Sequence, residues 1–324
     1  MHARTNTPLV SIITPAFNAS AYLSETVRSA LEQTYSNLEV LIVDDESTDG
    51  TIELARQWMT IDPRVKAWSI PHSGSSMARN TAIAKARGEI FALLDSDDIW
   101  MPEYLEEQVP LLTRGRNISI VTANAINRGG SQNGRPIWPV TTKASELGLL
   151  DIIEHEASVC IMSIFHRDVP DRLGGFDARF PSNEDYHFWL RATAAGFRML
   201  RNPTPLGYYR RRPNSVSADD RRMLHGIIAV LRDIAAHHDL SAEAQDAIDR
   251  QVRRFEGEIS RLDVRGFLDR RDADGAARSL QEWARARGRV GLGALSNIAR
   301  WWPQPLVWLY DLRRTLRTHG GSRV

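Results

Sequence analysis

The sequence predicts an α/β protein: a Rossmann-like, mostly parallel sheet flanked by helices, with a C-terminal helical extension. Three observations lead to this prediction. Apolar strand segments alternate with helical segments of about 10 to 15 residues in the N-terminal third, which is typical of βαβ units. Acidic or turn-forming residues follow directly after several of these strands. Beyond about Ala218 the strand signals stop, and arginine, alanine and aspartate become frequent.

The N-terminal third can be assigned element by element. Four segments are short, apolar and rich in β-branched residues, as buried parallel strands are, and they lie at 9–13, 38–43, 65–70 and 90–94. Helical periodicity occupies the intervals at 20–33, 51–59 and 75–86. Ser20 is a suitable N-cap for the first helix. Because ligands bind beyond the carboxyl ends of such strands, the residues that follow each strand are candidate site residues.

The rest of the chain has fewer strand signals. We expect a helix, a strand, a loop, a helix and an edge strand, in that order, at 102–114, 118–122, 173–183, 184–195 and 206–210. Amphipathic helices are expected at 219–238, 241–270 and 272–287. This change of pattern places a domain boundary near residue 218.

Composition excludes several classes of protein. Hydrophobic residues make up 42% and charged residues 25% of the 324 residues, which excludes a collagen-like or wholly disordered chain. The net charge of +1 provides no overall field for nucleic acid. The single cysteine, Cys160, excludes an intrachain disulfide and a cysteine-cluster zinc site. We find no signal-peptide pattern and no apolar run long enough to cross a membrane.

An acidic cluster follows the strand at 90–94. It contains Asp95 and Asp97, with Asp98 beside them. Crowded carboxylates repel one another unless a cation or a proton relieves them, and their hard oxygens suit Mg²⁺ or Mn²⁺ shared with a diphosphate. The alternative is a solvated acidic turn that caps the next helix. The position at a strand end, in line with two other polar strand ends, favours the metal site.

Those two other strand ends also carry candidate residues. Asp44 and Asp45 follow the second strand, where a carboxylate can accept hydrogen bonds from a nucleobase or ribose; capping of the next helix explains them equally well. Pro15, Phe17 and Asn18 follow the first strand, where an aromatic ring can stack on a base. A plain turn is an equally good interpretation of that segment.

Two later segments have a functional and a structural interpretation each. Glu184 and Asp185 open the helix at 184–195, where acidic residues suit the helix dipole, but one of them could also serve as a general base for an acceptor hydroxyl. The basic, aromatic segment 208–212 is either a solvated edge strand or a clamp on phosphate oxygens.

Residues 8–217 together resemble the family 2 glycosyltransferases, which have the glycosyltransferase-A fold. The matching pieces are PLVSIITPAFNASAYLSETVRSALEQTYSNLEVLIVDDESTDGT, SGSSMARNTAIAKARGEIFALLDSDDIW, LGGFDARFPSNEDYHFWLRATAAGF and YYRRRPNSVS. By this resemblance, Pro15, Phe17 and Asn18 would border the nucleotide pocket, Asp44 would recognise the base, usually uracil, and Arg79 would support the nucleotide side.

The resemblance also assigns the metal site and the catalytic base. Asp95 and Asp97 would form the Asp-x-Asp motif, with Asp95 also touching the nucleotide and both binding Mn²⁺ or Mg²⁺ together with the diphosphate. Asp185 would be the catalytic base, with Glu184 the weaker candidate. Physical chemistry is consistent with these roles, because the acceptor hydroxyl must lose a proton and the departing diphosphate gains negative charge.

One position departs from the family pattern. Many relatives have a histidine two residues after the Tyr-Arg pair, where this chain has Arg212. Arginine stays protonated and cannot be a neutral metal ligand, so Arg212, together with Arg210, would hold the diphosphate directly.

The function implied is that of an inverting, metal-dependent glycosyltransferase that acts by single displacement on a nucleotide sugar, with UDP as the expected nucleotide. It would make a surface polysaccharide or lipid-linked glycan at the cytoplasmic face of a bacterial membrane. The expected organisation is a catalytic domain at 1–218, with a nucleotide-binding half at 8–100 and an acceptor half at 101–218, then a helical region at 219–288 and a tail at 289–324.

Two rival functions remain open at this point. An Asp-x-Asp phosphotransferase of the aspartyl-phosphate type commonly has threonine where this chain has Ile99. A non-catalytic sugar-nucleotide-binding subunit would bind UDP and be indifferent to Asp185→Asn.

The tail at 289–324 is basic and rich in aromatic residues. It contains one acidic residue, Asp311, and six arginines, namely Arg289, Arg300, Arg313, Arg314, Arg317 and Arg323. Trp301, Trp302, Trp308 and Tyr310 lie in the same stretch. Such a mixture suits peripheral contact with a membrane surface; the alternative is that the tryptophans pack onto the catalytic domain or a partner subunit.

Overall fold

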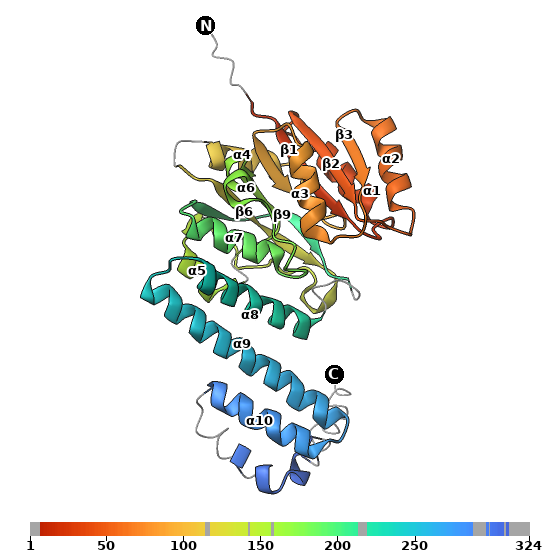
Figure 1. Ribbon diagram of the computed structural model, residues 1–324. Coiled ribbons are helices and arrows are strands. Elements are labelled where there is room, and N and C mark those ends of the chain that lie inside the picture. Colours follow the sequence, from red (N-terminus) through yellow and green to blue (C-terminus); the bar gives the residue numbers. More distant parts are fainter. Residues whose placement is uncertain are drawn as a thin grey trace.

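The computed structural model describes residues 7–113, 117–141, 143–156, 159–212, 219–287, 296–297, 299–307 and 309–310. In these residues, a central nine-stranded sheet is flanked by helices, and three long helices follow it toward the C-terminus (Figure 1). The α/β fold class with its helical extension is therefore confirmed.

The sheet is mixed, with a parallel N-terminal half. Its strands are β1 (Val10–Ala16), β2 (Leu38–Asp44), β3 (Val65–Ser69), β4 (Ile90–Leu93), β5 (Ile99–Trp100), β6 (Ile120–Arg128), β7 (Ser145–Leu147), β8 (Ser163–His166) and β9 (Met199–Arg210). Their order is β3-β2-β1-β4-β8-β6-β9-β5, with β7 also paired to β9. Strands β1 to β4 run parallel, whereas β8 is antiparallel to both β4 and β6.

The helices lie where amphipathic periodicity predicts them, with three short elements added. They are α1 (Leu23–Leu31), α2 (Thr51–Ile61), α3 (Ser75–Lys85), α4 (Tyr104–Thr113), η1 (Gly130–Gln132), α5 (Leu149–Glu154), α6 (Asp168–Leu173), α7 (Glu184–Ala194), α8 (Asp220–His237), α9 (Ala242–Asp269) and α10 (Ala273–Arg287). Among the described helices, none combines the length and apolar character that a membrane span requires.

Two sequence-based expectations are wrong. Ser20 does not cap the first helix: its backbone N–H and hydroxyl both donate to Asp49 Oδ2, and α1 begins three residues later. The strand expected at the edge is internal, because β9 pairs with β6 on one side and with β5 and β7 on the other. The prediction also missed the N-terminal half of β9, because it contains Pro203 and Pro205. Proline has no N–H to donate to a neighbouring strand, and the register between β9 and β6 shifts at these residues.

The hydrophobic core continues from the sheet into the C-terminal helices. The residues of β1 and β2 are buried along their whole lengths, as the apolar runs predict. Buried residues of α8 and of the first part of α9, up to Ile259, belong to the same core. A second, smaller core joins Val264 of α9 to α10 and to residues 299–306. The domain boundary expected near residue 218 stays a prediction.

The register of the parallel strands brings their carboxyl ends to one edge. Ala16 at the end of β1 pairs with Asp44 at the end of β2, and Ile13 of β1 pairs with Leu93 at the end of β4. The segments that follow β1, β2 and β4 therefore emerge side by side, and these segments carry the candidate site residues.

Candidate active site

Arg79 connects the two halves of the candidate site. It lies on the buried face of α3, one helical turn from Ala82 and Ile83, and is only 3% exposed. One guanidinium nitrogen donates to Asp95 Oδ1 at 2.7 Å and the other to Glu184 Oε1 at 2.6 Å. Burial alone would lower the pKa of Arg79, but the charges of the two carboxylates raise it on balance. Arg79 is therefore a fixed cation between the end of β4 and the start of α7.

Glu184 is held as an ionised partner of this cation. Its Oε1 also accepts a hydrogen bond of 2.6 Å from the Ser75 hydroxyl. Burial would raise the pKa of Glu184, but the charge of Arg79 and the hydrogen bonds hold it below its usual value. A carboxylate so engaged is poorly placed to take a proton from a substrate.

Asp185, its neighbour, has the opposite character. Burial first, and then the charge of Glu184, raise the pKa of Asp185 to about 6, while Arg79 opposes the rise. One oxygen, Oδ1, accepts from the backbone N–H of Tyr186 at 2.8 Å. A carboxylate with this pKa is ionised at neutral pH yet basic enough to accept a proton, which is the behaviour of a general base.

The turn that presents these two carboxylates has an unusual backbone. Asn183, which precedes α7, has φ of 60°, in the left-handed region that asparagine tolerates better than most residues. Its side-chain amide donates to the carbonyl oxygen of Met223 on α8 at 3.1 Å. Such conformations persist where the surroundings fix them, and they cluster at functional sites.

The acidic cluster after β4 contains three carboxylates with different surroundings. Asp97 Oδ2 pairs with Arg212 Nε at 2.6 Å. Burial and then the charge of Asp95 raise the pKa of Asp97, and Arg212 opposes the rise. Asp98 is only 1% exposed, and its Oδ1 accepts from the backbone N–H of Arg210 at 2.8 Å. Burial, followed by the charges of Asp97 and Asp95, raises the pKa of Asp98 well above its usual value, and the hydrogen bond that it accepts from Arg210 ties this segment to β9.

Asp95 and Asp97 have the donor chemistry of a cation site shared with a ligand. Their side chains are 27% and 14% exposed, and burial, followed by the negative charge of Asp95, raises the pKa of Asp97. Within the described ranges, no three or more histidine, cysteine or acidic side chains are placed so that they could together hold a metal ion. Two carboxylates are too few for an all-protein cage, but they are the number with which Mg²⁺ commonly binds when phosphate oxygens and water complete its shell. The residues present therefore fit such an ion.

The ends of β1 and β2 form the other half of the site. Asp44 is 1% exposed, and its Oδ2 accepts from the backbone N–H of Ser47 and the hydroxyl of Ser69. Its Oδ1 is buried and has no hydrogen-bond partner among the described residues. Such an unsatisfied acceptor is costly, and this oxygen can accept a hydrogen bond from a donor that the described residues do not supply.

The other residues of this half lie around Asp44. Phe17 is 47% exposed, and its ring faces His72 with 4.7 Å between centroids. Asn18, with φ of 45°, accepts from the backbone N–H of Thr48 at 2.9 Å and so holds the turn in place. Pro15 is buried within β1 and pairs with Val43, so it shapes the strand end rather than presenting a surface.

Asp45 has a structural role, whereas the sequence alone could not tell which of Asp44 and Asp45 has such a role. Its carboxylate accepts from the backbone N–H groups of Ser73 and Gly74, at 2.7 and 2.9 Å, and lies 2.9 Å from His72 Nδ1. These contacts fix the loop that leads into α3, and hence the position of Arg79.

The arginines at the end of β9 lie against α1 and the acidic cluster. Arg210 donates to the carbonyl oxygen of Asp97 at 2.8 Å and to Glu25 Oε2 at 2.6 Å. The guanidinium groups of Arg210 and Arg212 lie 4.8 and 5.2 Å from the ring centre of Tyr22. Sequence reasoning missed Tyr22 and Glu25, since nothing near them in sequence indicates a neighbour on β9.

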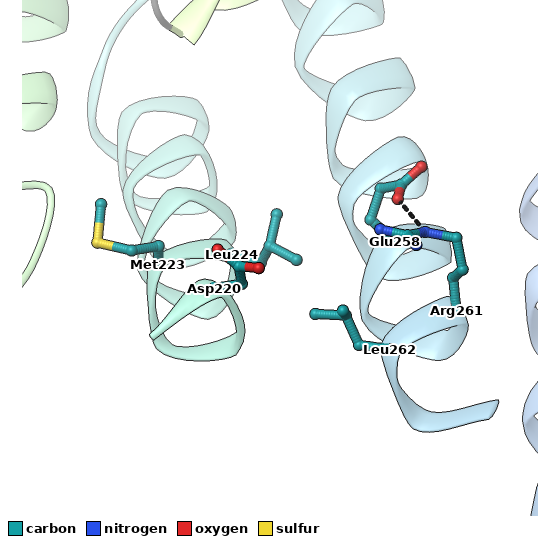
Figure 2. Close-up of a pocket in the computed structure, with 6 residues that line it drawn as sticks. All are labelled: Asp220, Met223, Leu224, Glu258, Arg261 and Leu262. Atoms are coloured by element: carbon teal, nitrogen blue, oxygen red, sulfur yellow. Dashed lines mark hydrogen bonds and ion pairs between the residues drawn. The ribbon is translucent and has the colours of Figure 1, made fainter. Parts of the chain in front are cut away.

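A cavity of about 220 Å³ lies elsewhere, between α8 and α9 (Figure 2). It is lined by Asp220, Met223, Leu224, Glu258, Arg261 and Leu262. None of the sequence-predicted site residues lines it. The candidate site lies instead at the carboxyl ends of the parallel strands. There Arg79 binds both Asp95, which is close to Asp97 in sequence, and Glu184, which precedes Asp185.

Fold and site together define a glycosyltransferase of the glycosyltransferase-A type. The family model described as glycosyl transferase family 2 matches residues 11–174. The chain is 30% identical over 236 residues to the putative teichuronic acid biosynthesis glycosyltransferase TuaG of Bacillus subtilis, covering 72% of this chain and 92% of that protein. It therefore belongs to glycosyl transferase family 2.

Other comparisons agree with this assignment. The chain is 34% identical over 184 residues to the UDP-Glc:alpha-D-GlcNAc-diphosphoundecaprenol beta-1,3-glucosyltransferase WfgD of Escherichia coli, covering 56% of this chain and 68% of that protein. Staphylococcus aureus TarS 1-349 in complex with UDP-GlcNAc has a similar fold, with a TM-score of 0.63, 19% identity and coverage of 92% and 89% of the two chains. The mannosyltransferase PcManGT from Pyrobaculum calidifontis, in complex with GDP-Man and Mn²⁺, gives a TM-score of 0.62, 20% identity and coverage of 95% and 87%.

Proposed function

We propose that this glycosyltransferase transfers a sugar from a nucleotide diphosphate donor, with UDP as the expected nucleotide, to a hydroxyl acceptor with inversion at the anomeric carbon. The observation that carries the proposal is the bridge made by Arg79. This bridge ties the donor-side carboxylate Asp95 to Glu184, beside which Asp185 has the pKa of a base.

The acceptor hydroxyl would be activated by Asp185. A hydroxyl is a poor nucleophile until a carboxylate takes its proton as the new bond forms. Asp185 has a pKa of about 6 and is therefore ionised at neutral pH, whereas the neighbouring Glu184 is occupied by Arg79 and Ser75. One base of this kind is sufficient for a single displacement, which is the mechanism we propose.

The nucleotide would lie along the ends of β1, β2 and β4. The unpartnered Oδ1 of Asp44 would accept a hydrogen bond from the base, and the exposed ring of Phe17 would stack against it. Pro15 and Asn18 would shape the turn on which Phe17 stands. Arg79 would support this side through its contact with Asp95.

The departing diphosphate would lie near Asp95, Asp97 and the arginines of β9. Mn²⁺ or Mg²⁺, held by Asp95 and Asp97, would supply positive charge for the leaving group. Arg212 and Arg210 would add fixed positive charge at the same place. Their contacts with Asp97 keep both guanidinium groups beside the acidic pair.

The acceptor class is proposed from the relatives. WfgD is named for transfer to a sugar on diphosphoundecaprenol, and TuaG for teichuronic acid biosynthesis. We therefore propose a surface polysaccharide or lipid-linked glycan as the product, made at the cytoplasmic face of the cell membrane with the chain as a peripheral protein. We keep 1–218 as the catalytic domain, with 8–100 for the nucleotide and 101–218 for the acceptor.

The test compares Asp185→Asn with the unchanged protein across a panel of nucleotide sugars, with and without Mn²⁺. We expect turnover to fall by about 100-fold or more with Asp185→Asn, because the proton has no acceptor, while UDP affinity stays within about twofold. Full turnover in this variant would contradict the assignment. Failure of every nucleoside diphosphate to bind would contradict the proposed function as a whole.

A further inference from the structure

We infer that the described residues 299–307 and 309–310 present Trp301, Trp302 and Leu309 as a surface that inserts into the headgroup region of an anionic phospholipid bilayer. The proposed function gives this surface a purpose, because a lipid-linked acceptor lies in a membrane. The inference itself depends on the geometry of the C-terminal residues and not on the identity of donor or acceptor.

The exposure of these side chains is the first observation. Trp301 is 83%, Trp302 66% and Leu309 49% exposed. All other tryptophans whose burial the structure describes are buried or partly buried. Two adjacent indole rings in water are costly for an isolated protein, and rings of this amphipathic kind prefer a membrane interface.

The segment that carries these rings is packed in place, which is the second observation. Ala299 is 2% exposed and lies in the second core, against Ala277 and Leu280 of α10. Leu306 packs on the same core, and the Tyr310 hydroxyl donates to Asp269 Oδ1 at 2.7 Å. The rings therefore project from a packed platform on α9 and α10, and their exposure belongs to the folded structure.

Charge selects the occupant of this surface. The guanidinium of Arg300 lies 5.6 Å from the ring centre of Trp301, at the edge of the surface. The sequence from 289 to 324 contains six arginines and one acidic residue, and of these seven only Arg300 lies within the described residues. A second copy of this chain would bring a second Arg300 to the interface and be repelled by the first, whereas an anionic bilayer attracts an arginine beside the inserted rings.

The test measures sedimentation of the full chain with vesicles, without donor or acceptor. Vesicles of phosphatidylcholine with phosphatidylglycerol are compared with phosphatidylcholine alone, at low and high salt. We expect binding to the anionic vesicles that weakens with salt, and a loss of about tenfold in partitioning for Trp301→Ala/Trp302→Ala. A matched control, Met59→Ala/Ile61→Ala, removes two exposed apolar side chains from α2 and is expected to bind as the unchanged protein does.

Two further readouts keep the inference separate from the proposed function. Transfer to a water-soluble acceptor should be unchanged in the tryptophan variant, which also shows that the variant is folded. Trp301→Phe/Trp302→Phe, which keeps apolar rings, should retain most of the binding. Equal binding by the alanine variant, equal binding to neutral vesicles, or a tryptophan-dependent dimer measured by light scattering would each overturn the inference.

Discussion

Arg79 occupies a position where an unpaired cation would be strongly destabilising. Its guanidinium is almost fully buried and depends on Asp95 and Glu184 for compensation. We expect Arg79→Gln to lower the free energy of unfolding by about 3 to 5 kcal/mol, because the buried Glu184 then loses its cationic partner and keeps only the Ser75 hydroxyl. Arg79→Gln/Glu184→Gln should recover part of this loss in chemical denaturation. A double variant as unstable as the sum of the single variants would show that the two side chains act independently.

Asp185 sets the pH dependence expected of catalysis. Its pKa of about 6 lies above the usual value for aspartate, so the base becomes protonated, and turnover falls, as the pH decreases through about 6. Glu184→Gln removes the charge that contributes to this rise, and it should move the acidic limb of the kcat profile to lower pH. A limb that stays near 6 in this variant would assign the titration to another group.

Asp44 is expected to govern the choice of base. The free acceptor Oδ1 is buried, so a hydrogen bond to the base would form without competition from water. We expect Asp44→Ala to weaken UDP binding by about 10- to 100-fold, the usual size for a hydrogen bond to a charged group. Calorimetric titration with UDP, CDP and GDP measures this effect. An unchanged preference for UDP would place base recognition elsewhere.

At the scale of elements, α9 contains two glycines that should respond differently to the same substitution. A Cβ on Gly257 would lie 2.8 Å from Ala286 Cβ on α10, whereas a Cβ on Gly266 would meet the flexible end of Arg270 at 3.6 Å. Alanine favours a helix interior by about 1 kcal/mol over glycine. We expect Gly266→Ala to raise the unfolding temperature slightly and Gly257→Ala to lower it and expose α10 to proteolysis. The same response from both variants would contradict this packing.

The elements differ in how far the sequence could predict them. Strands β1, β2 and β4 are recognisable because parallel strands buried on both faces are continuous apolar runs. The first half of β9 is not, because Pro203 and Pro205 interrupt the pattern while Asn124 of β6 donates to the carbonyl of Pro203. Glu184 and Asp185 could be predicted as candidate site residues. Which of them is paired and which has the raised pKa depends on Arg79, which lies 105 residues before Glu184 in sequence.

At the scale of the whole molecule, donor binding should be visible as stabilisation. The strand-end site gathers segments from β1, β2, β4 and β9, so a ligand there binds only the folded protein. A nucleoside diphosphate at about 100 times its Kd should add about 2.7 kcal/mol to the free energy of unfolding. We expect UDP with Mn²⁺ to raise the unfolding temperature more than UDP with EDTA. Asp97→Asn should remove this difference, and Asp239→Asn, a change in the α8–α9 connection, should leave it intact.

Helix α9 belongs to both cores, and with the proposed membrane contact this continuity would limit which acceptors can react. It runs without a break for 28 residues, about 42 Å at 1.5 Å per residue, from the core of the sheet to the platform that carries the tryptophans. If the indole rings of Trp301 and Trp302 lay among the lipid headgroups, a continuous helix of this length would hold the candidate active site at a fixed distance from the membrane. Only hydroxyls at that distance would be within reach, so the enzyme would select its acceptor by the number of sugars already attached as well as by their identity.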